Sequence, residues 1–224
     1  MPDKYELRTQ YIPALLCSLP FTLFGVYFLH NLDTDFWNTV LAQAAGGFSI
    51  AAALYYFASK VCRSVGKLIE EKIFKDGREF PTSRFLMDSD EHFSDDFKQE
   101  IFIKIKGEFG IELDGKTAGR ATDKRRIHEA VSRIRQKFFM KNDLIAQRNI
   151  DYGFSRNTLG GAVVALVASI GLAILSLLTD ADAALKLSAL LIIWNALLII
   201  FGWLTLHSNA DRYAHTLFTE FVSS

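Results

Sequence analysis

The stretch that decides the fold is Leu159–Leu178, which reads LGGAVVALVASIGLAILSLL and contains no charged residue. About 20 apolar residues of this kind form a helix that crosses the roughly 30 Å hydrocarbon core of a bilayer. Three more such stretches occur, at Tyr11–Leu29, Trp37–Ala58 and Leu187–Leu206. They lie as two pairs on either side of a charged block from Lys60 to Arg156. The pattern predicts an all-α membrane protein with four transmembrane helices in two hairpins and a mainly helical cytosolic insert between spans two and three.

The same pattern divides the chain into four parts. Residues 1–58 comprise an N-terminal tail and the first hairpin, 59–158 the helical insert, 159–206 the second hairpin, and 207–224 a C-terminal tail that is predicted to form a short interfacial helix. The first apolar run contains Pro13 and Pro20 and lacks a small-x-small cleavage motif. These features favour a retained span over a cleaved signal peptide.

The distribution of basic residues predicts the orientation. The connectors 30–36 and 179–186 contain a single basic residue, Lys186, whereas most Lys and Arg lie in the insert. Segments rich in Lys and Arg near span ends stay in the cytoplasm. We therefore expect both termini and residues 59–158 to be cytoplasmic.

Within the insert, apolar residues at helical spacing continue the second span to about Phe74. Pro81–Met87 is predicted to be extended and 111–122 to be a loop. A long helix should begin near Thr122, and it is expected to run on past Leu144 towards span three.

The segment around residue 100 allows two interpretations. Ser94 is followed by two Asp residues, which is typical of a helix N-cap. Ile101, Ile103 and Ile105 also alternate as in a strand. We favour the helix, and the strand at 100–106 stays open.

Small residues recur inside the spans, at Gly46 and Gly47 in span two and at every fourth position of span three: Gly161, Ala165, Ser169 and Ala173. Small faces allow helix backbones to approach closely in lipid. They predict close helix packing and favour a homo-oligomer.

Gln43 in span two and Asn195 in span four are polar residues inside predicted spans. They could line a shared polar path, or each could form a hydrogen bond across helices worth about 0.6 kcal/mol. The spans contain no Asp, Glu, Lys or Arg, which argues against a coupled pump.

Basic residues far outnumber acidic ones between Lys116 and Arg148. One interpretation is attraction to anionic lipids of the inner leaflet. The other is a binding site for a nucleotide or a nucleic acid. The residues expected to take part are Lys124, Arg125, Arg126, Arg133, Arg135 and Lys137.

No pattern predicts catalysis. The five His residues have no partner at metal-ligand spacing, and the acidic cluster 88–96 lacks the glycine and terminal Glu of a calcium loop. Phosphate-loop, nucleophile-elbow and redox-cysteine motifs do not occur either. We therefore predict no catalytic residues, no metal and no cofactor.

The stretch 149–157 joins the insert to span three. Asn149, Gly153 and Arg156 would allow a hinge that relays cytosolic events to the spans. An ordinary turn at the membrane interface is the alternative.

Four segments together resemble a group of uncharacterised bacterial inner-membrane proteins. They are Pro81-Thr-Ser-Arg-Phe-Leu, Phe97-Lys-Gln-Glu-Ile, Arg126-Ile-His-Glu-Ala-Val-Ser-Arg-Ile-Arg and Asn149-Ile-Asp-Tyr-Gly-Phe-Ser-Arg-Asn. Members of that group have two spans, a cytosolic insert and two more spans, and some lie in anti-phage defence islands. The resemblance implies a bacterial inner-membrane location and a role in immunity or stress response.

These observations predict a non-enzymatic, oligomeric membrane protein that senses a signal or binds a cytosolic protein through its insert. In a defence setting its response would be to perturb the membrane. The alternative is a scaffold that recruits a cytosolic enzyme without conducting anything.

Overall fold

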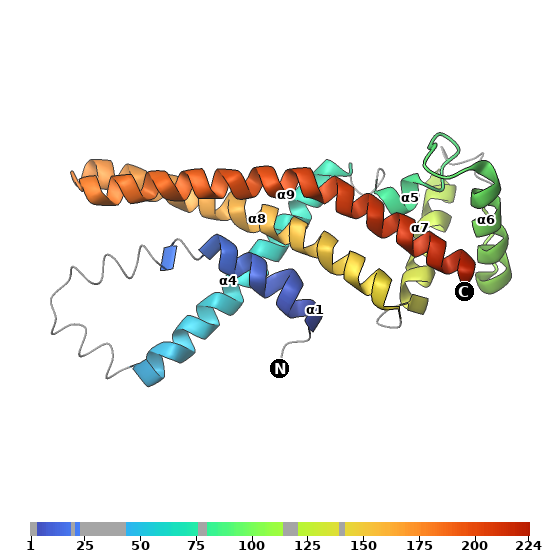
Figure 1. Cartoon of the computed structure of the whole chain (residues 1–224), viewed down its shortest axis with the longest axis horizontal. Helices are drawn as coiled ribbons and strands as arrows, with labels where there is room; N and C mark the ends of the chain where they lie inside the picture. The colour runs from blue at the N-terminus through green and yellow to red at the C-terminus, as the bar shows by residue number, and fades with distance from the viewer. Residues whose placement is uncertain (1–3, 19–20, 23–43, 76–79, 114–120, 139–141) are drawn as a thin grey trace. The chain divides into compact units, whose positions relative to one another are not determined.

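A computed structural model describes residues 4–18, 21–22, 44–75, 80–113, 121–138 and 142–224 (Figure 1). All regular structure in these ranges is helical, which confirms the predicted all-α class. The chain begins with α1 (Lys4–Glu6), a π-helical turn (Leu7–Tyr11) and a helical stretch at 12–18. The later helices are α4 (Ala44–Ile73), α5 (Pro81–Arg84), α6 (Asp95–Phe109), α7 (Ala121–Phe138), α8 (Asp143–Leu178) and α9 (Asp182–Ser223).

The described part of the chain has two helices that are long and apolar enough to cross a membrane, α8 and α9. Thr179 and Asp180 turn the chain between them, and the two helices lie side by side in Figure 1. Much of the first predicted hairpin, including the connector 30–36 and Gln43, lies outside the described residues. The helix α4 covers the later part of the second predicted span and ends at Ile73, close to the predicted end at Phe74.

The chain forms two compact units. Unit 1 consists of Met1–Ile69 and Gly153–Thr205, and unit 2 consists of Glu70–Tyr152 and Leu206–Ser224. Residues 70–152 of the predicted insert therefore belong to one compact body with the C-terminal tail, although they are far apart in sequence, and the two ends of the insert belong to unit 1.

Unit 2 has an aromatic and aliphatic core. Phe85, Ile101, Ile134 and Phe218 are fully buried in it, and they come from four segments of the chain. The expected interfacial tail helix is not observed as a separate element, because residues 207–223 continue α9 and their apolar stripe is buried in this core. An apolar stripe cannot distinguish a membrane surface from a protein core as its partner.

Two local expectations in unit 2 can be compared directly with the structure. The segment at Pro81 is a single helical turn rather than an extended strand, because proline is well suited to the first position of a helix. The segment 95–109 is the helix α6, and the Ser94 side chain accepts a hydrogen bond from the Phe97 amide at 3.3 Å. The predicted N-cap is confirmed, and the strand alternative is wrong.

The stretch 149–157 is neither a turn nor a loop. The helix α8 runs without a break from Asp143 through Asn149, Gly153 and Arg156 into the predicted third span. It is separated from α7, which ends at Phe138, so the long run-on from Thr122 is not observed. The division between the two units falls between Tyr152 and Gly153, within this stretch.

Candidate functional site

The most closely packed place in unit 1 is the crossing of α4 and α8. A Cβ atom at Gly160 would overlap the backbone of Gly66 and the carbonyl oxygen of Cys62. A Cβ atom at Gly66 would lie 2.6 Å from the carbonyl oxygen of Arg156. Glycine is needed at both positions because any side chain would have to displace a neighbouring backbone. Span three was predicted to pack closely, but sequence reasoning missed Gly66 and Gly160 as the contact points.

The helix α8 also contacts α9 and the N-terminal helical segment. A Cβ atom at Gly202 would lie 2.9 Å from the Leu159 Cβ atom. The side-chain amide of Asn157, which is fully buried, donates to the carbonyl oxygen of Thr9. Trp194 Nε1 on α9 donates to the Leu16 carbonyl oxygen at 3.1 Å. Unit 1 is therefore a bundle built around the first half of the third predicted span.

The predicted small-residue face of span three packs within the chain. Gly161, Ala165 and Ser169 are buried, and Ala173 is half-buried. The face is therefore occupied along much of its length by contacts inside unit 1. Gly46 and Gly47 lie in α4, but their surroundings fall outside the described residues.

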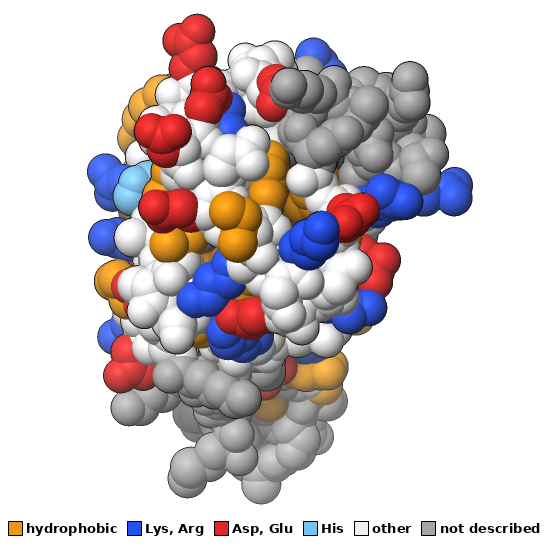
Figure 2. Space-filling view, turned by 90° about the vertical axis from the view of Figure 1, so that its right-hand side faces the viewer, with side chains coloured by type: hydrophobic (Ala, Val, Ile, Leu, Met, Phe, Trp, Pro, Cys, Tyr) orange, Lys and Arg blue, Asp and Glu red, His pale blue; other side chains and the backbone are white. Residues whose placement is uncertain are grey.

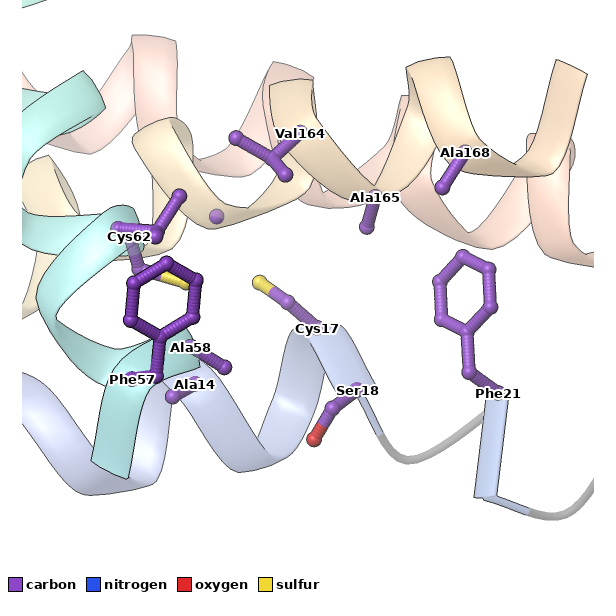
Figure 3. Close-up of a pocket in the computed structure, with 12 residues that line it drawn as sticks. Ala14, Cys17, Ser18, Phe21, Phe57, Ala58, Cys62, Val164, Ala165 and Ala168 are labelled. Atoms are coloured by element: carbon purple, nitrogen blue, oxygen red, sulfur yellow. The ribbon is translucent and has the colours of Figure 1, made fainter. Parts of the chain in front are cut away.

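The side chains of the two cysteines of the chain, Cys17 and Cys62, lie close together (Figure 3). A Cβ atom at Gly161 would lie 2.8 Å from Cys17 Sγ and 2.8 Å from Cys62 Sγ. Both thiols are reduced and buried, and Cys17 Sγ donates to the Thr158 carbonyl oxygen at 3.7 Å. A close pair of buried thiols is not visible in the sequence, where 44 other residues separate them.

This geometry predicts that an apolar oxidant such as copper–phenanthroline links Cys17 to Cys62 within one chain. The product should lose two hydrogen atoms and resist alkylation at both positions, as measured by intact mass. The Cys17→Ser variant should form no such product. A disulfide between two chains in place of the internal one would contradict the packing around Gly161.

An apolar pocket of about 280 Å³ opens beside the cysteine pair. Its walls come from α4, from α8 and from the N-terminal residues Ala14, Cys17, Ser18 and Phe21. Figure 3 shows the rings of Phe21 and Phe57 at its two ends. Small side chains create the hollow, among them Ala58, Ala165 and Ala168. Such a wall offers dispersion contacts and shape but little polar chemistry.

Asn195 lies between α9 and α8 and is fully buried. Its Nδ2 atom donates to the Leu191 carbonyl oxygen at 2.9 Å and to Ser169 Oγ at 3.3 Å. Its Oδ1 atom has no hydrogen-bond partner among the described residues. The arrangement is the interhelical hydrogen bond expected as one alternative, and Gln43, the other predicted polar residue, lies outside the described part.

The predicted basic residues on α7 are distributed over different faces of the helix. Arg133 pairs with Glu129 at 2.7 Å, and Lys137 pairs with Glu108 at 2.9 Å. Arg135 donates to Thr82 Oγ1 at 3.1 Å, and its guanidinium lies over the rings of Phe80 and Tyr213.

The two other described members of the set, Arg125 and Arg126, are exposed, and the side chain of Lys124 is outside the described residues. Arg126 borders a polar hollow of about 350 Å³ with Lys106 and Glu112. The Lys106 ammonium, 2.6 Å away, lowers the pKa of Glu112. On the surface in Figure 2, acidic and basic side chains are intermixed. The structure therefore does not gather the six predicted residues into one anion site.

Unit 2 also contains a cluster of aromatic and charged side chains around His92. The His92 ring stacks on Phe85 at 3.8 Å between centroids and meets His215 of α9 at 5.5 Å. Arg84 bridges Asp90 at 2.9 Å and Asp211 at 3.1 Å. These contacts tie the loop before α6 to the C-terminal half of α9.

The His92 cluster predicts a pH dependence of stability. Burial first, and then the neighbouring His215, lower the pKa of His92 below its ordinary value of 6.5, against the raising effects of Asp211 and Asp90. His92 is protonated more easily in the unfolded chain than in the folded one. Neutral His92 therefore contributes to the stability of unit 2 above pH 6.5, and this contribution is lost as the pH falls through the lowered pKa.

We expect the melting temperature of unit 2 to fall between about pH 8 and about pH 5.5, and to fall less in a His92→Gln variant. The matched control is His128→Gln on α7, which removes an imidazole that is not one of the rings stacked around His92. An identical profile for His92→Gln and wild type would contradict the assignment.

No group of three or more His, Cys, Asp or Glu side chains in the described part of the chain is arranged to hold a metal ion. The candidate site consists of the apolar pocket with the adjoining cysteine pair and glycine crossing. Comparison of the chain with protein-family models, with curated proteins and with solved structures found no match.

Proposed function

We propose that this chain is a multi-pass membrane protein of the bacterial inner membrane that works by binding, not by catalysis. Unit 1 anchors it in the bilayer, and unit 2 senses a signal or binds a partner in the cytoplasm. Both termini lie on the cytoplasmic side, and the first predicted hairpin completes a set of four spans.

One observation carries this proposal, namely the exposed surface of unit 1. Leucine, isoleucine, valine and aromatic side chains of α8 and α9 stand outward, with Val167 67%, Leu178 78% and Leu204 69% exposed. No Asp, Glu, Lys or Arg lies between Arg156 and Asp180. Contiguous apolar surface of this extent is costly in water and is favourable in lipid.

Unit 2 has the opposite distribution of side chains. Its apolar side chains form the buried core around Phe85 and Phe218, and many of its charged side chains are exposed, among them Lys106, Glu112 and Arg133. That distribution is the one expected of a body surrounded by water. The contrast supports a membrane anchor joined to a cytosolic binding unit.

The proposal is tested by membrane extraction and by topology reporters. The full chain should stay in the membrane fraction through alkaline carbonate, and a green fluorescent protein fused after Ser224 should fluoresce. Alkaline phosphatase inserted after Asp180 should be active outside the cytoplasm, whereas the matched insertion after Gly110 should be inactive. Release of the chain by carbonate would overturn the proposal.

A membrane-perturbing role in anti-phage defence is the second candidate. It is favoured by Asn195, whose Oδ1 atom is buried without a partner among the described residues of unit 1. An unpaired polar atom in an apolar surrounding costs free energy, so a rearrangement that supplies a partner would be favourable. Oligomerisation of the spans is one such rearrangement.

The two candidates differ in the membrane potential of cells that overproduce the chain. For the anchored binding protein, we expect wild-type cells to exclude dye and to keep their potential. If wild type depolarises the membrane, Asn195→Ala should abolish the effect, whereas Ser188→Ala should retain it. Ser188 is the control because it is equally buried on α9 and its hydroxyl donates to Leu185 of its own helix.

A further inference from the structure

We infer that the apolar pocket of unit 1 is a binding site for one acyl chain of an inner-leaflet lipid. The inference rests on the proposed function, because it requires unit 1 to lie in a bilayer. The pocket holds about 280 Å³, close to the lower end of the roughly 300–1,000 Å³ range of ligand sites in proteins.

The described residues that line the pocket offer little polar surface to a ligand. The hydroxyl group of this wall, Ser18 Oγ, donates to the Leu15 carbonyl oxygen at 3.4 Å. The thiol of Cys17 donates to the Thr158 carbonyl oxygen. The other wall side chains are hydrocarbon, apart from the thiol of Cys62. A ligand that fits this wall is itself a hydrocarbon, which gains dispersion contacts that an empty hollow would lack.

The mouth of the pocket opens among exposed apolar side chains. Phe57 on its rim is 67% exposed and Val164 is 37% exposed, and Val167 next to it on α8 is 67% exposed. In the proposed arrangement these side chains face lipid, so acyl chains surround the mouth at high concentration. A bilayer lipid therefore needs no separate route into the pocket.

The depth of the pocket in the bilayer also fits an inner-leaflet lipid. Its wall on α8 extends from Gly161 to Ala168, which is about 10 Å along the axis at 1.5 Å per residue. The predicted third span begins at Leu159 on the cytoplasmic side, so this wall lies in the inner half of a core roughly 30 Å thick.

The test uses the full chain reconstituted in vesicles of phosphatidylethanolamine and phosphatidylglycerol. A small fraction of the phosphatidylglycerol bears a photoactivatable diazirine in one acyl chain, and labelled residues are located by mass spectrometry. Labelling of Val61 and Cys62 should exceed that of lipid-facing residues at every fraction of the probe, because an acyl chain held in the pocket stays beside them. Labelling of Leu197 and Ile200, which are exposed on α9, should rise in proportion to the probe.

Two substitutions fill the pocket from different helices, Ala168→Phe on α8 and Ala58→Leu on α4. Each substitution should reduce the photolabelling of Cys62 at least about fivefold, because the added side chain occupies the space of the acyl chain. The matched control is Ile174→Phe, because Ile174 is exposed on α8 and does not line the pocket, so this variant should leave the label unchanged.

Each result has a distinct meaning. Label at Cys62 that does not exceed the label at Leu197, or that survives both filling substitutions, would overturn the inference. In either case, label on Leu197 would leave the membrane proposal intact. An absence of label on both Leu197 and Cys62 would overturn the membrane proposal together with the inference.

Discussion

Replacing Gly160 by alanine is expected to separate α4 from α8 and to destabilise unit 1 strongly. The new Cβ atom would overlap the backbone of Gly66 and the Cys62 carbonyl oxygen, and backbone atoms cannot move aside as a side chain can. Core overpacking typically costs about 1–3 kcal/mol, and a clash with backbone belongs above that range. The measurement is unfolding of the purified chain by sodium dodecyl sulfate in mixed micelles.

Gly171 provides the matched control on the same helix. A Cβ atom there would meet nothing within 4 Å, so Gly171→Ala should be neutral or should stabilise by up to about 1 kcal/mol through helix propensity. If Gly160→Ala were as stable as Gly171→Ala, the crossing of α4 and α8 at this glycine would be incorrect.

Replacing Phe218 by alanine is expected to unfold unit 2 or to leave it marginally stable. Phe218 is fully buried in the core, where Phe93 meets its ring edge-on at 6.0 Å between centroids. Truncation of a buried phenylalanine costs about 3–5 kcal/mol, which is a large part of the stability of a small domain. Hydrogen exchange of α6 and α7 is the appropriate measurement, since neither helix contains the substitution.

The neighbouring residue gives the control for this prediction. Thr219 is exposed, and its hydroxyl donates to the His215 carbonyl oxygen of the same helix, so Thr219→Ala should cost little. If residues 207–223 instead lay on the membrane surface, Phe218→Ala would leave hydrogen exchange in α6 and α7 unchanged. The experiment therefore separates a core role of the C-terminal segment from an interfacial role.

The sequence predicted correctly those features that depend on interactions between residues near one another in the chain. Ser94 followed by two acids predicted the start of α6, and the structure shows its side chain accepting from the Phe97 amide. The apolar stripe of α7 was likewise predicted, and Ile134 on it is fully buried. A cap or a stripe depends on residues within a few positions, so a single sequence contains the relevant information.

Contacts between distant segments were not predictable in the same way. The sequence contains no redox-cysteine motif, yet the thiols of Cys17 and Cys62 both lie against Gly161. The basic residues of α7 were grouped by their proximity in sequence, whereas Arg135 and Lys137 have different partners, Thr82 and Glu108. Which residues share a site depends on how helices pack, and helical spacing alone does not specify the partner of a face.

By itself, the sequence determined that the chain is helical and that α8 and α9 are long and apolar enough to cross a membrane, because length and hydrophobicity are properties of one segment. Only the tertiary structure decided that the C-terminal segment completes the core of unit 2, and that Gly66 and Gly160 form the helix crossing beside an apolar pocket. The physical reason is that burial and close approach are properties of pairs of segments, and the partner of each segment is selected by the packing of the whole chain.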